Sequence, residues 1–107
     1  MFYKKNSDNY LNPIDGIKLK TLTFGEKTSL TEFVMEKGKD LPAHDHPHEQ
    51  IGFLVSGKIE LTIADEVFSV NPGDSWCIPG GVQHAANIKE DSIAIEVFSP
   101  VREDYLP

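Results

Sequence analysis

Short apolar runs separated by turn residues recur along the whole chain. They follow one another at a spacing of about 8–12 residues, which is typical of an all-β sandwich or barrel. No long stretch keeps the period of about 3.6 residues that marks an amphipathic helix. The pattern therefore predicts many short strands and no substantial helix.

The apolar alternation also gives the approximate bounds of the strands. We expect strands at residues 17–20, 30–36, 58–63, 67–70, 75–78, 82–88 and 92–99, and turns at 64–66, 71–74, 79–81 and 89–91. The residues up to about Pro13 are expected to form a loose arm or an edge strand. Many short strands must bury one face without leaving open edges, so we expect them to form a small barrel or jelly roll.

Length and charge narrow the classes of function. The 107 residues suffice for one domain, and 39% hydrophobic with 25% charged residues is an ordinary globular balance. The formal net charge is −7, which disfavours binding to nucleic acids or to anionic membranes. An anionic small molecule would need a local positive centre within this acidic protein.

The single cysteine and the N-terminal segment bear on the cellular location. Cys77 has no partner for an intramolecular disulfide, and its apolar neighbours predict a buried side chain. Residues 1–10 are polar and lack the apolar region of a signal peptide, and no apolar run is long enough to span a membrane. We therefore expect a cytoplasmic protein.

Histidines supply the candidate chemistry. His44 and His46 lie two residues apart, so an extended chain places both rings on one face, as chelation of one metal ion requires. Gln50 has the same parity, and His84 could face the same cavity from another strand. A solvated polar loop whose histidines have no common role is the alternative, and the glycines around the cluster decide against it.

Two glycine-bounded motifs resemble those of the cupin superfamily. The first runs Gly38, His44, His46, Gln50, Gly57, and the second runs Gly73, Pro79, Gly81, His84. Asn87 lies one position earlier than the second motif requires. The resemblance implies a small double-stranded β-barrel that holds a metal ion. It carries over His44, His46, Gln50 and His84 as ligands and gives His48 a non-ligand position.

Gln50 stands where cupins usually have Glu. Three neutral imidazoles and a neutral amide leave the 2+ charge of the ion uncompensated, which makes it a strong Lewis acid and attracts carboxylates. Such a site could supply the positive centre that the acidic surface lacks. Imidazole with one oxygen ligand suits Ni, Zn, Fe, Mn or Co.

The last predicted strand has two mixed faces. Ile93, Ile95 and Val97 share one face, and Ala94, Glu96 and Phe98 share the other. The β-branched face would ordinarily pack in the core, which would make Glu96 a solvent-exposed carboxylate. In a barrel the second face can instead line the ligand cavity, and Glu96 would then be directed at the site. Arg102, taken alone, could be a surface residue.

The run at residues 97–106 resembles the C-terminus of the KdgF-type cupins of pectin and alginate breakdown. The His-Pro-His-x-Gln of the first motif and the Met-Phe start with an early Gly-Ile-Lys extend the likeness. Proteins of this type linearise 4,5-unsaturated uronates to 5-keto-4-deoxyuronates. The resemblance implies that Glu96, Phe98 and Arg102 are active-site residues, although the acid is usually Asp.

These observations together predict a single cupin domain at residues 1–107. Its metal motifs lie within 38–87, and its active-site strand and tail lie within 92–107. We expect a metal-dependent isomerase or lyase acting on an anionic uronate, and a homodimer formed through exposed sheet edges or faces. The alternatives are another metal-dependent cupin enzyme, such as an oxygenase or a sugar isomerase, and a non-catalytic small-molecule-binding cupin.

Overall fold

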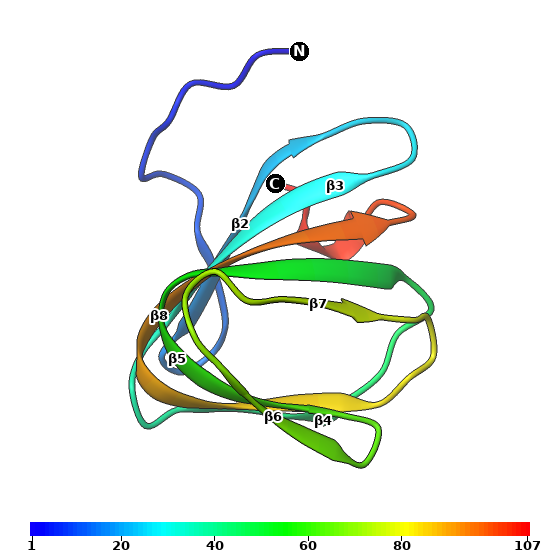
Figure 1. Ribbon diagram of the computed structural model, residues 1–107. Helices are drawn as coiled ribbons and strands as arrows, with labels where there is room; N and C mark the ends of the chain where they lie inside the picture. Colours follow the sequence, from blue (N-terminus) through cyan, green and yellow to red (C-terminus); the bar gives the residue numbers. More distant parts are fainter.

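The computed structural model describes residues 1–107 and confirms the all-β prediction (Figure 1). Eight strands and one short 3-10 helix, η1, make up the chain. Their bounds are β1 Leu11–Ile14, β2 Ile17–Phe24, β3 Ser29–Met35, β4 Asp40–His44, β5 Glu49–Ile63, β6 Glu66–Val70, β7 Ser75–Ile78, β8 His84–Ser99 and η1 Glu103–Tyr105.

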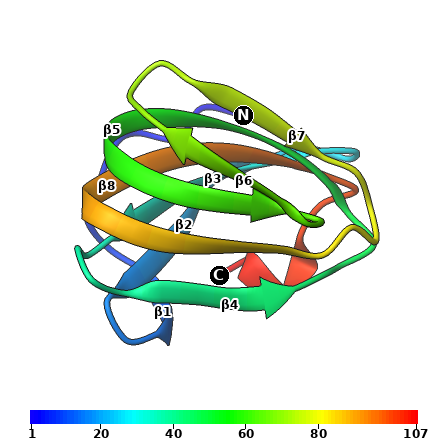
Figure 2. The same ribbon diagram turned by 60° about the horizontal axis from the view of Figure 1, so that its bottom comes forward.

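The long antiparallel strands β5 and β8 join two layers of a jelly roll (Figure 2). In one layer, residues 92–98 of β8 pair with β3, and residues 50–53 of β5 pair with β7. In the other layer, residues 84–87 of β8 pair with β4, and residues 59–63 of β5 pair with β6. β4 pairs only with β8, and β7 only with β5. Hydrogen bonds therefore do not close the layers into a ring.

The turn predicted at 89–91 is wrong, because β8 runs through these residues without a break. Lys89, Glu90 and Asp91 are exposed where β8 crosses from one layer to the other. Gly57 lies against this crossing with φ +93°, and a Cβ there would lie 2.2 Å from Ser92 Oγ. Residues 89–91 are polar because they lie exposed on the outside of a bent strand, and their composition therefore resembles that of a turn.

The core lies between the two layers. It consists of twelve buried apolar side chains: Ile17, Leu19, Phe33, Met35, Leu54, Ile59, Leu61, Val70, Ala86, Ile88, Ala94 and Phe98. Cys77, which was expected to be buried, is exposed on β7. Its neighbours in the sequence, Trp76 and Ile78, face inward instead, because side chains alternate along a strand.

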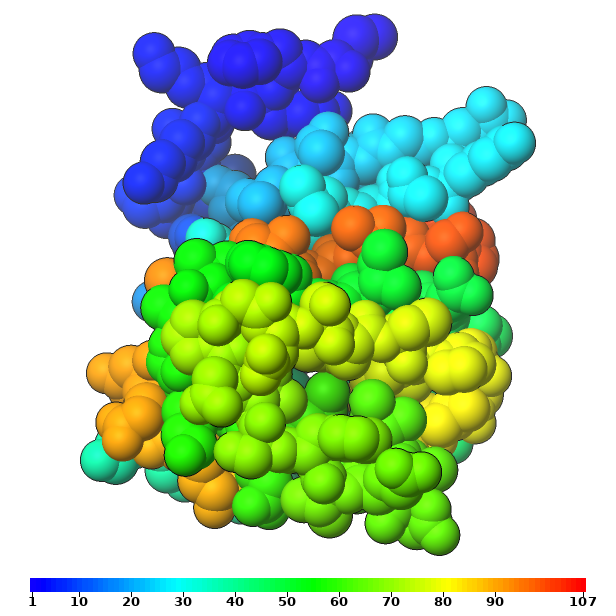
Figure 3. All heavy atoms as spheres, in the orientation of Figure 1, coloured from blue at the N-terminus to red at the C-terminus, as the bar shows by residue number.

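The N-terminal segment contains both a loose arm and an edge strand, the two alternatives expected from the sequence. Residues 1–10 form an arm without strand structure, and Leu11–Ile14 pairs with β2 at the edge of the sheet. The arm stands away from the body of the protein in the space-filling view (Figure 3).

No helix in the structure has the length and apolar character needed to cross a membrane.

Candidate metal centre

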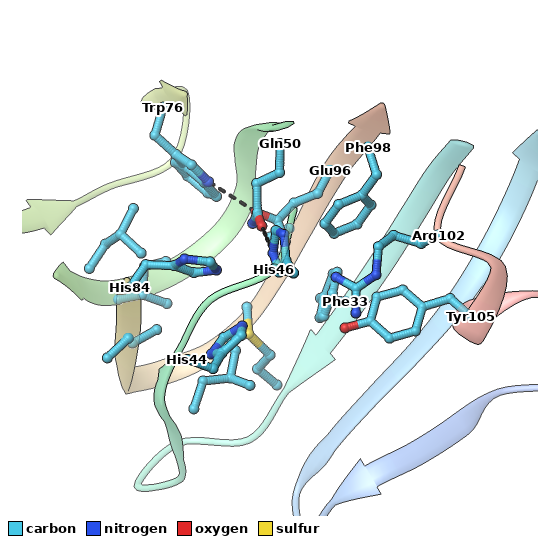
Figure 4. Close-up of a pocket in the computed structure, with 17 residues that line it drawn as sticks. Phe33, His44, His46, Gln50, Trp76, His84, Glu96, Phe98, Arg102 and Tyr105 are labelled. Carbon is cyan, nitrogen blue, oxygen red and sulfur yellow. Dashed lines mark hydrogen bonds between the residues drawn. The ribbon is translucent and has the colours of Figure 1, made fainter. Parts of the chain in front are cut away.

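Three histidines meet at one end of the space between the layers (Figure 4). His44 ends β4 and pairs across the sheet with His84, which begins β8, and His46 follows in the connection to β5. Their candidate ligand atoms all lie within 4.8 Å of one another. The histidines that the sequence grouped by parity are therefore close enough to share one metal ion.

Backbone carbonyls orient the three imidazole rings. In each ring Nδ1 lies 2.9–3.0 Å from a carbonyl oxygen: that of Pro42 for His44, of His48 for His46, and of Val82 for His84. A carbonyl can only accept, so Nδ1 carries the proton and Nε2 keeps its lone pair. Metal-binding histidines are held in this way. The Nε2 of His84 is buried and has no hydrogen-bond partner.

Gln50 presents its amide oxygen to His46 of this cluster. Its Nε2 donates to Glu96 Oε1 at 2.6 Å, which directs its Oε1 toward His46 Nε2 at 2.8 Å. When His46 is neutral, both of these atoms are acceptors, so no hydrogen bond joins them. Donor atoms at about 2.1 Å from one ion lie roughly 3.0–3.4 Å apart, close to this spacing. The donor set therefore fits a divalent cation.

The electrostatics favour the neutral form of two of the imidazoles, those of His46 and His84. Burial lowers the pKa of His84, and burial followed by the Arg102 charge lowers the pKa of His46. Protonated imidazole cannot bind a metal, so a lowered pKa keeps the ligands available at neutral pH. His48 lies beside the cluster, and the structure gives it a different part: its carbonyl oxygen orients the ring of His46.

We expect the purified protein to carry about one divalent transition metal ion per chain, because three histidine donors lie within 4.8 Å of one another and the amide oxygen of Gln50 lies 2.8 Å from one of them. Replacing His84 with Ala should abolish stoichiometric metal uptake, since it removes a buried donor. Elemental analysis measures both. His48→Ala is the matched control and should keep its metal, because the carbonyl that orients His46 belongs to the backbone. A folded wild-type protein that takes up no added Ni, Zn, Mn or Fe would contradict the metal site.

A pocket opens beside the histidine cluster. It encloses about 50 Å³, room for a few water molecules. Besides the candidate metal ligands, its polar and aromatic lining comprises Phe33, Trp76, Glu96, Phe98, Arg102 and Tyr105. A sugar-sized ligand would have to occupy its open mouth as well as its interior.

Glu96 faces this pocket rather than solvent. The Ala94, Glu96 and Phe98 face of β8 is buried, and the β-branched face is only partly buried. Glu96 is 8% exposed, and burial raises the pKa of its carboxyl against the opposing effects of hydrogen bonds and of Arg102. Of the two readings that the alternation left open, the cavity-facing one is correct. The raised pKa suits a group that gives and takes a proton.

Arg102 is the only arginine in the chain and is 8% exposed. Its Nε and Nη2 donate to the Asp104 carboxylate at 2.9 and 2.8 Å. Its Cζ lies 3.9 Å from the ring centroid of Tyr105 and 4.9 Å from that of Phe98. Asp104 occupies one edge of the guanidinium, so Nη1 and the second N–H of Nη2 are left for another acceptor.

The aromatic walls include residues that the sequence predicted and residues that it did not. Phe98, a predicted site residue, is buried between the rings of His46 and Tyr105, with both centroid distances at 5.8 Å. Tyr105 and Trp76 were not predicted as site residues. For the tail that contains Tyr105, the sequence did offer one signal, because the charges of Arg102-x-Asp104 indicate a local ion pair. Nothing local in the sequence marks Trp76.

Comparison with known proteins adds an independent line of observation. Residues 31–99 match the cupin domain family. The chain is similar to the pectin degradation protein KdgF of Dickeya dadantii (strain 3937), at 31% identity over 94 residues, which cover 86% of each protein.

Two solved structures are also similar over almost the whole chain. KdgF from a Halomonas species superposes with a TM-score of 0.92 at 29% identity, covering 99% of this chain and 100% of that one. An RmlC-like cupin from Shewanella frigidimarina NCIMB 400 superposes with a TM-score of 0.91 at 25% identity, covering 99% of this chain and 96% of that one. The backbone is thus similar over 99% of the chain, and the sequence similarity covers 86% of it.

Proposed function

Since this chain belongs to the cupin domain family, we propose that it is a metal-dependent enzyme of pectin or alginate breakdown, which opens 4,5-unsaturated uronates to 5-keto-4-deoxyuronates. The observation that carries this proposal is one pocket that combines a histidine cluster with a buried carboxyl group and a buried arginine. The relationship to a pectin degradation protein supports the substrate class.

The reaction needs a proton carrier and an anchor. The anomeric hydroxyl loses its proton, the bond from C1 to the ring oxygen breaks, and C1 becomes an aldehyde. The ring oxygen leaves with the bonding electrons as an enolate oxygen, and a proton delivered to C4 turns that enolate into the C5 ketone. Atoms and electrons balance without an oxidant. In this proposal Glu96 carries the proton, and the free edge of Arg102 binds the substrate carboxylate.

The other side chains of the pocket support the proposed roles of Glu96 and Arg102. A divalent ion held by His44, His46, Gln50 and His84 would supply Lewis acidity to a substrate oxygen. Phe98 and Tyr105 flank the guanidinium of Arg102 and keep water from its faces. Because the guanidinium is shielded from water in this way, it attracts an anionic ligand more strongly than an exposed arginine would.

Incubation with unsaturated mono-uronates tests the proposal. The enol-ether absorbance should fall with enzyme concentration, under anaerobic conditions as well as in air, and NMR should identify the keto product. Oxygen uptake during turnover would indicate an oxygenase instead. Saturable binding of these uronates without turnover would indicate a non-catalytic binding protein.

Gln50→Glu is expected to retain the metal and to lower turnover. The new carboxylate neutralises part of the charge of the ion and weakens its Lewis acidity. It also removes the N–H that Gln50 donates to Glu96 and places two carboxyl groups side by side. Elemental analysis and the absorbance assay measure the two effects. Loss of metal from this variant would show that Gln50 is not a ligand.

The homodimer and the cytoplasmic location stay proposals. The outer face of β5 offers a surface for self-association, since Ile51, Phe53 and Val55 are each 46–48% exposed. Apolar clusters on a protein surface often mark an interface. Phe53→Lys should therefore convert a dimer to a monomer in analytical ultracentrifugation. A monomeric wild-type protein would contradict this.

A further inference from the structure

Trp76 reaches across a neighbouring strand to contact Glu96. Gly52 of β5 is paired with Trp76 of β7 on one side and with Glu96 of β8 on the other, so the three form one row across the sheet. Trp76 and Glu96 would ordinarily be separated by the side chain of the middle residue. Here that residue is glycine, and the row has an open slot at its centre.

The indole of Trp76 fills this slot. A Cβ on Gly52 would lie 2.2 Å from Cε2 and 2.3 Å from Nε1 of the indole, far inside van der Waals contact. The ring therefore lies directly over the Gly52 backbone, in a position that no other residue type at 52 would permit without displacing it. Its Nε1–H donates to Glu96 Oε1 at 3.0 Å (Figure 4).

Both hydrogen bonds to Glu96 go to the same oxygen. Gln50 Nε2 donates to Oε1 at 2.6 Å, beside the indole N–H, and no protein donor contacts Oε2. A glutamate side chain has three rotatable bonds, so an unrestrained carboxyl group would occupy several rotamers. Two donors from different strands fix one rotamer and leave Oε2 as the oxygen open to a ligand.

We propose that Trp76 is a positioning residue, which acts through Glu96 and depends on the slot at Gly52. Its contribution to turnover rests on the proposed function, whereas its hold on the carboxylate does not. Proton transfer requires the two atoms within hydrogen-bond distance and in line. Losing one of two restraints should therefore reduce kcat and affect KM little.

NMR tests the contact without any substrate. Trp76 is the only tryptophan of the chain, so the 15N-labelled protein gives one indole N–H signal. We expect Glu96→Ala to move this signal upfield and to speed its exchange with solvent. Gly52→Ala should do the same by displacing the indole. Gly25→Ala is the matched control, because a Cβ there meets nothing within 4 Å. An indole signal unchanged by Glu96→Ala would overturn the proposal.

Kinetics test the consequence. Trp76→Phe keeps an aromatic ring and deletes the N–H. We expect kcat to fall about 10- to 100-fold, the range for a lost hydrogen bond to a charged group, with KM changed less than about twofold and metal content unchanged. Gly52→Ala should give a comparable loss, because it displaces the indole although Trp76 itself is unchanged. Unchanged kcat in Trp76→Phe, or a parallel loss of metal, would overturn the positioning role.

The two tests separate this inference from the proposed function. If the wild-type protein does not turn over the uronates, the proposed function fails, and the NMR result still decides whether Trp76 holds Glu96. If the wild-type protein is active and Trp76→Phe matches it, the proposed function stands and the positioning role fails. Should Gly52→Ala not fold, Trp76→Phe alone decides the kinetic question.

Discussion

Replacing Glu96 with Gln is expected to lower kcat by about 10²–10⁴-fold, the range for loss of a positioned acid or base. The amide has nearly the same shape as the carboxylate, and its oxygen can still accept the N–H groups of Trp76 and Gln50 that now meet Glu96 Oε1. It cannot carry the proton. The loss should therefore fall on kcat, with KM close to wild type, in a steady-state assay on an unsaturated mono-uronate.

Glu103→Gln is the matched control for this variant. It makes the same chemical change on an exposed residue of η1 outside the pocket, so its rate should stay at the wild-type level. Both variants should keep their metal and their unfolding temperature, because neither residue is among the four donors. Wild-type turnover by Glu96→Gln would remove Glu96 from the reaction and leave it a buried structural group.

The strand pattern could be predicted because alternation is a local signal. The strands at 17–20, 30–36, 67–70 and 75–78 all recur in the structure within a few residues or as part of longer strands. The bend in β8 could not be predicted from local composition. Lys89, Glu90 and Asp91 have the polarity of a turn, and only the register with β5, including the Lys58 to Glu90 pair, shows that they continue a strand.

The inward face of β8 was ambiguous for a related reason. Alternation shows that Glu96 and Ile95 face opposite sides, and it does not show which side is covered. The β-branched Ile93, Ile95 and Val97 lie on the partly buried outer face, and Ala94, Glu96 and Phe98 line the interior. Which face is covered depends on how the two layers fold over each other, which is a property of the whole chain.

The site likewise contains residues that could be predicted from local sequence and residues that could not. His44, His46 and Gln50 lie within seven residues of one another, so their convergence follows from extended geometry and the motif spacing. Trp76 enters the site only because Gly52 lies between it and Glu96 in the sheet. That row joins residues far apart in sequence, and strand pairing is not visible in one sequence.

Arg102→Ala is expected to raise KM for the uronate by roughly 30- to 1,000-fold and to lower kcat much less. The guanidinium has one edge on Asp104 and offers its free N–H groups to the substrate carboxylate. A charge-assisted pair of this kind in a partly buried site is worth about 2–4 kcal/mol, which corresponds to that range. An anchor that binds substrate and transition state equally well changes KM and not kcat.

Arg102→Ala removes packing contacts as well as the charge, so a rise in KM has two possible causes. Arg102 lies against Phe98 and Tyr105, so its removal also leaves a gap that can lower the unfolding temperature. Arg102→Lys keeps the charge and part of the packing but lacks the planar fork, and its KM should lie between wild type and Ala.

The methyl ester of the uronate separates anchoring from packing, because it has no carboxylate for Arg102 to bind. If Arg102 is the anchor, wild type and Arg102→Ala should show similar KM values for the ester and differ only on the free acid. A KM that rises equally for both substrates would assign Arg102 to the shape of the pocket. A fall in kcat as large as that of Glu96→Gln would assign it to the transition state instead.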